Sequence, residues 1–245
     1  MAAAAESAAP TVAPEDLSPG RQEPIFLADD TKIGLDQLRV SANYKQYLSH
    51  VMIPQGYIND RIAGLADQIA AEHLDTCPHL LCVLNGASVF MMKLVEELHK
   101  AYSARACCVG KAPFTIGFCR VKSYAGTAST GEVLITGLIG DELKGRTVIV
   151  VEDIVDTGLS MTRLLPKLRE ELEVEKAVVC SLIEKRTEKS CGLKARYVGF
   201  SVPDHFVVGC GLDFNEAFRE LNHICVINKA GIEKFKDFLL AKPSA

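Results

Sequence analysis

The chain has 245 residues, of which 48% are apolar, and this is enough for one domain or for one domain with an appended subdomain. Its net charge of −4 and its pI near 5.9 argue against a dedicated binder of nucleic acid or of membrane surfaces. Its nine cysteines are irregularly spaced and include no Cys-x-x-Cys pair, so we expect reduced thiols and neither a zinc site nor a disulfide scaffold.

Residues 1–24 are expected to form a disordered tail. The stretch from Met1 to Glu23 is rich in Ala, Pro and Glu and has almost no large apolar side chain to offset the entropy of ordering. Acidic residues precede Arg21, the first basic residue, which argues against a mitochondrial transit peptide. No apolar run approaches the length needed to cross a membrane. We therefore expect a cytoplasmic protein with no membrane partner.

The rest of the chain, residues 25–245, reads in order as alternating helices and strands. A helix capped by Asn59-Asp60 is expected first, then a buried strand at 80–84 and a helix with apolar residues from 90 to 98. Further strands are expected at 114–121, 132–136, 147–151, 176–183, 197–200, 205–209 and 224–227, before a terminal helix with Ile232, Phe235 and Phe238. Such alternation specifies an α/β fold with a doubly wound parallel sheet and right-handed crossovers.

Residues 147–160 are the most informative segment of the chain. Residues 147–151 are an unbroken β-branched run, typical of a strand buried on both faces of a parallel sheet. Glu152 and Asp153 follow where such a sheet places its ligand. Small and hydroxyl-bearing residues from Asp156 to Ser160 then open a helix, whose N–H groups and dipole can hold a phosphate. Ribose hydroxyl groups and Mg²⁺ are the ligands that suit two carboxylates beside a phosphate.

This segment resembles the motif that binds phosphoribosyl diphosphate (PRPP) in the type I phosphoribosyltransferases. Further segments follow in the order found in the hypoxanthine-guanine phosphoribosyltransferases of eukaryotes: Lys122-Ser123-Tyr124, Ser129-Thr130-Gly131, Glu184-Lys185-Arg186-Thr187, Phe206-Val207-Val208-Gly209, Leu212-Asp213-Phe214-Asn215-Glu216 and Phe218-Arg219. The resemblance runs from about Tyr47 to Phe235. It implies the type I phosphoribosyltransferase fold, with a mainly parallel core sheet at about residues 58–200 and a small hood from about 25–57 and 201–240.

The resemblance also implies an activity. It implies a purine salvage transferase that uses Mg²⁺ and converts PRPP and hypoxanthine or guanine into IMP or GMP and pyrophosphate. Whether xanthine is a further substrate, giving XMP, stays open. The partners implied are PRPP, 6-oxopurine bases and further copies of the chain, in a homodimer or a homotetramer, with no nucleic acid.

The family motifs assign roles to residues by their positions. Asp156 takes the place of the general base near purine N7. The ribose and 5′-phosphate subsite comprises Glu152, Asp153, Asp156, Thr157, Gly158, Leu159 and Ser160. The residues implied to bind pyrophosphate are Asn85, Gly86 and Arg219. The residues implied to bind the purine are Lys185, which donates to O6, and Phe206, Val207, Leu212 and Asp213. The residues implied to bind the metal are Glu152, Asp153 and Asp213. The mobile lid begins at Lys122, Ser123 and Tyr124. Taken alone, Asp156 also suits a helix cap and Lys185 an exposed strand end.

Two positions depart from the family pattern. Asn85 stands where the family usually has a lysine preceded by a cis peptide, and Leu159 stands where animal enzymes usually have a lysine. We expect both to tune the binding of PRPP and pyrophosphate without abolishing turnover. They also support an alternative, a catalytically impaired homologue that binds PRPP or nucleotides as a regulator. The presence of Asp156, Lys185, Asp213 and Arg219 argues against that alternative.

Overall fold

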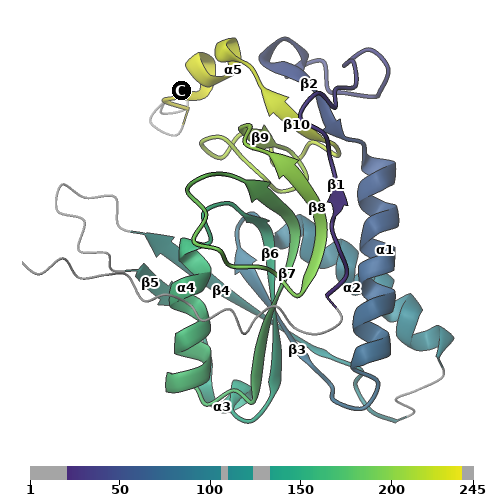
Figure 1. The fold of residues 1–245 in the computed structure, drawn as a ribbon, viewed down its shortest axis with the longest axis vertical. Coiled ribbons are helices and arrows are strands. Elements are labelled where there is room, and N and C mark those ends of the chain that lie inside the picture. The colour runs from purple at the N-terminus through teal and green to yellow at the C-terminus, as the bar shows by residue number, and fades with distance from the viewer. Residues whose placement is uncertain (1–20, 106–109, 124–132, 239–245) are drawn as a thin grey trace, which may run out of the picture.

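The computed structural model describes residues 21–105, 110–123 and 133–238, so residues 1–20 of the expected tail lie outside the described residues. The described strands form a large sheet and a small sheet (Figure 1). In spatial order the large sheet has β1 (Ile25–Phe26), β8 (Tyr197–Pro203), β7 (Lys176–Arg186), β6 (Thr147–Val155), β3 (His79–Leu84), β4 (Thr115–Ser123) and β5 (Val133–Thr136). Neighbouring strands in it run parallel except β4 and β5.

Helices cover both faces of the large sheet, as Figure 1 shows for α1 (Gln55–Glu72) and α2 (Ser88–Ala104) on one side and α4 (Leu159–Pro166) on the other. The alternation of side chains along β6 requires this cover. Ile149 and Val151 pack in the hydrophobic cluster of α1 and α2, whereas Val148 and Val150 pack in the cluster of α4. The α/β fold with a doubly wound, mainly parallel sheet is therefore confirmed.

The small sheet lies at one end of the large one and is antiparallel. It consists of β2 (Leu48–Ile53), β10 (Ile224–Ile227) and β9 (Val207–Val208), and α5 (Lys229–Phe235) lies beside it (Figure 1). Its own core contains Phe218 and Phe235, with ring centroids 4.7 Å apart. The segment expected for the hood at 25–57 is divided, because β1 pairs with β8 of the large sheet.

Several element boundaries differ from the expected ones. The first helix begins at Gln55, so Asn59-Asp60 lies inside it instead of capping it, and Asn59 Oδ1 accepts a hydrogen bond from Lys93. The terminal helix ends at Phe235, which leaves Phe238 outside it and half exposed. Four elements were not expected at all: β1, the 3-10 helix η2 (Lys45–Tyr47), β2 and α3 (Gly140–Leu143). Two to four residues carry too little periodicity to reveal β1, η2 and α3, whereas the six residues of β2 include Ser49 and His50, which interrupt its apolar run.

The central strands are longer than the β-branched runs that predicted them. β6 continues to Val155 and β7 to Arg186, and their parallel pairing extends to Val155 opposite Glu184. A neighbouring strand can keep the backbone paired even where side chains become polar, so polarity ended the expected strands too early. As a result, Glu152, Asp153 and Lys185 are held on strands and not on loops.

Other features of the described residues bear on the remaining expectations. The helix that opens at Leu159 ends at Pro166, which has no N–H to continue the helical hydrogen bonds, and the chain goes on as a π-helical turn at Lys167–Glu171. The thiols of Cys82, Cys119 and Cys180 are free and buried. No helix in the described ranges is long and apolar enough to cross a membrane.

Candidate active site

The site lies at the carboxyl edge of the large sheet, where β3 and β6 are neighbours. From β3 the chain passes to β4 on one side, and from β6 it passes to β7 on the other. The loops that follow β3 and β6 therefore lead away in opposite directions, and such a switch point is where open α/β sheets bind their ligands. Asn85-Gly86 follows β3, and Asp156 begins the loop after β6.

Close backbone contacts bring three segments together at this edge. A Cβ atom on Gly86 would lie 1.8 Å from Asp153 Oδ2, and one on Gly211 would lie 2.1 Å from the carbonyl oxygen of Gly86. Only glycine fits at either position, and Gly211 also has a positive φ of 98°. The Leu84–Asn85 peptide is cis, as the family resemblance implied.

The two carboxylates on β6 differ in their surroundings. Asp153 is buried and accepts a hydrogen bond from the Ile154 N–H at 3.0 Å. Burial raises the pKa of Asp153 to about 6, although that hydrogen bond and the charge of Arg219 act in the opposite direction. Burial and the charge of Asp153 also raise the pKa of Glu152 well above its usual range. Glu152 Oε2 is buried and has no hydrogen-bond partner among the described residues, so it can accept one from a ligand.

Asp153→Asn should change how stability depends on pH. The unfolded state loses the Asp153 proton near its ordinary pKa of 3.8, whereas the ligand-free folded state keeps it up to about pH 6. Between these values the folded state binds more protons, so this residue's contribution to stability falls as pH rises and is constant above about pH 6. As the pH rises across this window, the free energy of unfolding of the variant should increase relative to that of the parent by at most about 3 kcal/mol. Urea unfolding at several pH values checks it, and a difference independent of pH would contradict it.

The loop after β6 has the geometry expected of a phosphate site. Gly158 has a φ of 82° and precedes α4, whose first N–H groups have no intrahelical acceptor. The positive φ favours glycine there, and a Cβ atom on Gly158 would also lie 2.6 Å from Cys191 Sγ. The carbonyl of Thr157 accepts a hydrogen bond from the Cys191 N–H at 2.8 Å, which fixes the loop. The Leu159 side chain is exposed and carries no charge, so only the backbone N–H of this residue can bind a phosphate.

Lys185 faces the same loop from the neighbouring strand β7. Its Nζ lies 3.1 Å from Asp156 Oδ2 and 3.6 Å from Asp204 Oδ1. The Lys185 side chain is only 9% exposed, whereas those of Asp156 and Asp204 are about half exposed. The structure thus brings the expected base and the expected purine donor into direct contact.

The remaining purine residues lie in and beside the small sheet. Val207 and Leu212 are buried, and Val207 pairs with Val226 of β10. Phe206 is 48% exposed, and its ring meets that of Phe214 edge to face at 5.3 Å. A half-exposed ring held at its edge can offer its flat face to a ligand.

Asp213 and Arg219 form an ion pair instead of standing apart. Arg219 Nη1 lies 2.9 Å from Asp213 Oδ1 and donates to the Gly211 carbonyl at 2.8 Å. The second oxygen of Asp213 accepts from the Glu216 N–H at 2.7 Å. Because Gly211 touches Gly86, Arg219 is anchored beside the loop that follows β3.

The three expected metal ligands are not gathered into one cluster. In the part of the chain that the structure describes, no group of three or more His, Cys, Asp or Glu side chains could hold a metal ion. Glu152 and Asp153 are neighbours on β6, but Asp213 is engaged by Arg219 and by Glu216. A metal ion here would need further oxygen ligands from a substrate or from water, as is common for Mg²⁺.

Sequence reasoning missed Arg120. This residue lies opposite Leu84 in the pairing of β3 with β4, and its Nη2 donates to Asn85 Oδ1 at 3.2 Å. A positive charge therefore lies beside Asn85, at the position where the family lysine is absent. Strand register alone creates this contact, and no local sequence pattern indicates it.

The expected lid is only partly within the described residues. Lys122 and Ser123 form the end of β4, where their backbones pair with Leu134 and Val133 of β5. Tyr124 lies outside the described residues.

Comparison with known proteins agrees with this geometry. The family model of the phosphoribosyl transferase domain matches residues 54–215. The human hypoxanthine-guanine phosphoribosyltransferase is 40% identical over 223 residues, which cover 89% of this chain and 98% of that protein. The hypoxanthine-guanine-xanthine phosphoribosyltransferase of Plasmodium falciparum is 39% identical over 214 residues, 87% of this chain and 92% of that protein.

A solved structure agrees as well. The hypoxanthine-guanine phosphoribosyltransferase of Schistosoma mansoni, in complex with IMP, superposes with a TM-score of 0.72 at 32% identity and covers 87% of this chain and 100% of that one. The chain therefore belongs to the phosphoribosyl transferase family and, within it, to the group of the hypoxanthine-guanine phosphoribosyltransferases. The resemblance read from the sequence is confirmed, and the protein is a phosphoribosyltransferase.

Proposed function

We propose that this enzyme transfers the phosphoribosyl group of PRPP to a nitrogen of hypoxanthine or guanine and releases pyrophosphate. The observation that carries the proposal is the contact between Lys185 Nζ and Asp156 Oδ2 at 3.1 Å, beside the phosphate loop. A charged donor at the end of β7 and a carboxylate in the loop after β6 thus lie side by side, which supports their acting together on one bound purine. The acceptance of xanthine is a finer question that the assay below decides.

Each residue group has a separate task in this reaction. The C1′–oxygen bond to pyrophosphate breaks while the C1′–nitrogen bond to the purine forms, and Asp156 accepts the purine proton at N7. Lys185 donates to O6 of the purine. Adenine has a 6-amino group in place of O6, and because this group is itself a donor, it cannot accept that hydrogen bond. The amides from Thr157 to Ser160 hold the 5′-phosphate, and Glu152 Oε2 accepts from a ribose hydroxyl. Arg219 stabilises the charge that grows on pyrophosphate.

A magnesium ion fits this site only together with substrate. Carboxylate oxygens are its preferred protein ligands, and the unpartnered Glu152 Oε2 is one of them. We propose that Glu152, Asp153 and Asp213 would hold it together with oxygen atoms of the substrate. When bound, Mg²⁺ would neutralise part of the diphosphate charge.

The direct test measures pyrophosphate release with hypoxanthine, guanine, xanthine and adenine in separate reactions. We expect turnover with hypoxanthine and guanine and very little with adenine. Rapid formation of AMP would contradict the assignment of Lys185 to a 6-oxopurine. No turnover with any base, combined with tight binding of PRPP, would instead favour the regulatory alternative.

Asn85→Lys tests whether a missing charge limits the affinity for PRPP. The added ammonium group should lower the KM for PRPP several-fold at most, since an exposed ion pair is worth about 1 kcal/mol or less. Arg120 already supplies a charge at 3.2 Å from Asn85 Oδ1, which also limits the gain. Asn85→Met is the matched control without charge. Steady-state kinetics measure both constants, and an equal change with Lys and Met would contradict a role for charge.

We also propose that the chain associates with copies of itself and that it is located in the cytoplasm. Ile116, Phe118 and Leu134, on the neighbouring strands β4 and β5, are each more than 40% exposed, and a second copy of the chain could cover them. The free, buried thiols suit a reducing compartment. Analytical ultracentrifugation distinguishes a dimer from a tetramer.

A further inference from the structure

The first described residues of the chain, 21–29, lie along the outer edge of the large sheet. Ile25 pairs with Phe200 and Phe26 with Ser201, in parallel, as the course of β1 beside β8 shows (Figure 1). We call residues 21–29 the N-terminal segment. It lies next to β8, and β8 is the strand that separates it from β7.

The N-terminal segment nevertheless reaches β7 through a buried ion pair. Arg21 Nη2 donates to Glu184 Oε2 at 2.9 Å, and the two side chains are only 11% and 7% exposed. The other oxygen of Glu184 accepts from the Ala195 N–H at 2.8 Å. Lys194 is farther away, with its Nζ 3.7 Å from Glu184 Oε2. Among the residues that the structure describes, Arg21 is therefore the cation nearest to this carboxylate.

A second attachment involves Arg186. Its Nη2 donates to the Leu27 carbonyl at 2.7 Å and to Asp29 Oδ1 at 2.6 Å, and its Nη1 donates to the Ser201 carbonyl at 2.8 Å. The Phe26 ring lies over the guanidinium group, with 4.1 Å between the centroid and Cζ. The N-terminal segment thus supplies a carbonyl, a carboxylate and an aromatic ring to one arginine.

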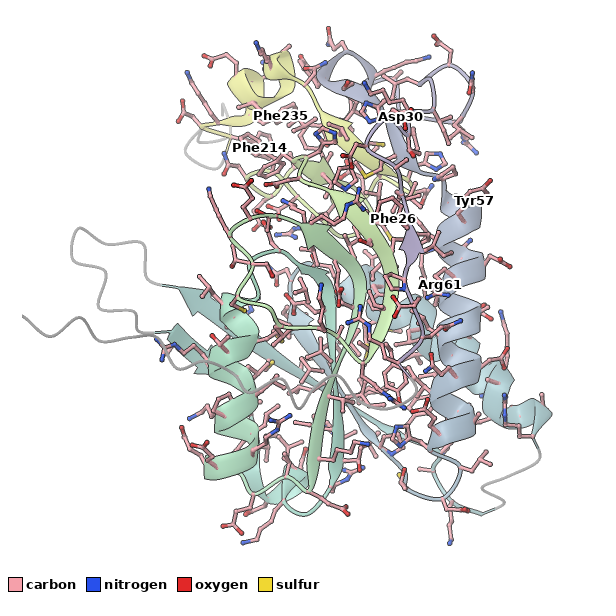
Figure 2. The ribbon with its side chains drawn as sticks, viewed as in Figure 1. Phe26, Asp30, Tyr57, Arg61, Phe214 and Phe235 are labelled. Carbon is pink, nitrogen blue, oxygen red and sulfur yellow. The ribbon has the colours of Figure 1, made fainter. Side chains whose placement is uncertain are left out.

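A third attachment fixes the backbone between these two. Arg61, labelled on α1 in Figure 2, donates to the Glu23 carbonyl at 2.8 Å, and it also donates to the carbonyls of Val198 and Gly199 on β8. The N-terminal segment is therefore tied to α1 and to β8 as well as to β7.

The residues held in this way flank the purine donor. Glu184 and Arg186 are the neighbours of Lys185 on β7, and alternate residues of a strand point to opposite faces of the sheet. The N-terminal segment therefore holds the side chains on either side of Lys185 and leaves Lys185 facing Asp156 and Asp204. A shift of the backbone at the end of β7 would therefore disturb the contacts of Glu184 and Arg186 with the N-terminal segment.

We propose that the N-terminal segment positions Lys185 for purine recognition, with Arg21 and Glu184 as positioning residues. The proposal rests on the proposed function. A buried ion pair adds little net stability, because the loss of hydration offsets the attraction between the charges. It does fix geometry, because leaving either charge unpaired in a buried position is costly. The pair is thus better suited to hold the end of β7 in place than to stabilise the fold.

The test is steady-state kinetics of Arg21→Met in the full chain. Loss of the ion pair should raise the KM for hypoxanthine by roughly three- to tenfold, since small misplacements of a recognition group are costly. The KM for PRPP should stay within about twofold of the parent, because the phosphate loop is not touched. Arg21→Lys should restore most of the purine affinity. A role in stability alone predicts a lower melting temperature with no selective change in either constant.

Two further variants keep the test decisive. Phe26→Ser removes an exposed ring from Arg186, should fold normally, and should raise the KM for hypoxanthine in the same direction but by less. Arg105→Met is the control, because it removes a more exposed arginine–carboxylate pair, in which Arg105 at the end of α2 contacts Asp67 of α1 and not β7. It should leave both KM values unchanged.

The outcomes separate this inference from the proposed function. Unchanged purine constants in both Arg21→Met and Phe26→Ser, or an equal rise of both KM values, would overturn the positioning role. A parent without turnover would overturn the proposed function, and calorimetry then replaces kinetics. In that case IMP should bind more weakly to Arg21→Met than to the parent, whereas ribose 5-phosphate, which lacks the purine, should bind equally to both. Equal binding of IMP would overturn the positioning role.

Discussion

Asp156→Asn is expected to lower kcat by about 10²–10⁴-fold, the contribution of a positioned general base. The amide cannot accept the purine proton. Its oxygen can still accept a hydrogen bond from Lys185 Nζ, which lies 3.1 Å from Asp156 Oδ2 in the parent. The phosphate loop is unchanged, so the KM for PRPP should change much less. Single-turnover and steady-state kinetics with hypoxanthine measure both effects.

The control for Asp156→Asn lies beside the same lysine. Asp204 Oδ1 is 3.6 Å from Lys185 Nζ, so Asp204→Asn removes a similar charge without removing the proposed base. We expect Asp204→Asn to keep kcat within a few-fold of the parent. Near-normal turnover of Asp156→Asn, or an equal loss in both variants, would show that the base has been assigned wrongly.

Lys185→Ala should reduce kcat/KM for hypoxanthine and guanine by roughly 10- to 100-fold, the worth of a hydrogen bond from a charged donor. The Lys185 side chain is 9% exposed, so water can replace it only poorly. The discrimination between hypoxanthine and adenine should shrink as well, because the donor that opposes the 6-amino group is gone. Competition assays with the two bases measure the ratio directly.

Lys176→Ala is the control for Lys185→Ala, since Lys176 is an exposed lysine at the opposite end of the same strand β7. It should leave both the efficiency and the ratio of the two bases unchanged. If Lys185→Ala retained the hypoxanthine preference of the parent, the O6 contact would have to come from another residue. Because Lys185 also touches Asp156, the effects of Lys185→Ala and Asp156→Asn should not be additive.

The sequence by itself determined the fold class and the order of the site motifs along the chain. Strands buried on both faces are short, nearly continuous apolar runs, and this signal is local, so 80–84, 147–151 and 176–183 could be recognised without a structure. The phosphate loop is equally local, because a glycine with positive φ and the start of a helix lie within a few residues. The spacing of such motifs then identified the family.

Only the tertiary structure decided which distant residues meet. Arg21 and Glu184 are 163 residues apart, and Arg120 and Asn85 are 35 apart, so no periodicity links them. Their contacts depend on strand order and on parallel register, which put β1 beside β8 and Arg120 opposite Leu84. The same register extended β6 and β7 beyond their apolar runs, so that Glu152, Asp153 and Lys185 lie on rigid strands. Local sequence encodes which residues can do the chemistry, whereas pairing across the sheet fixes where their side chains lie.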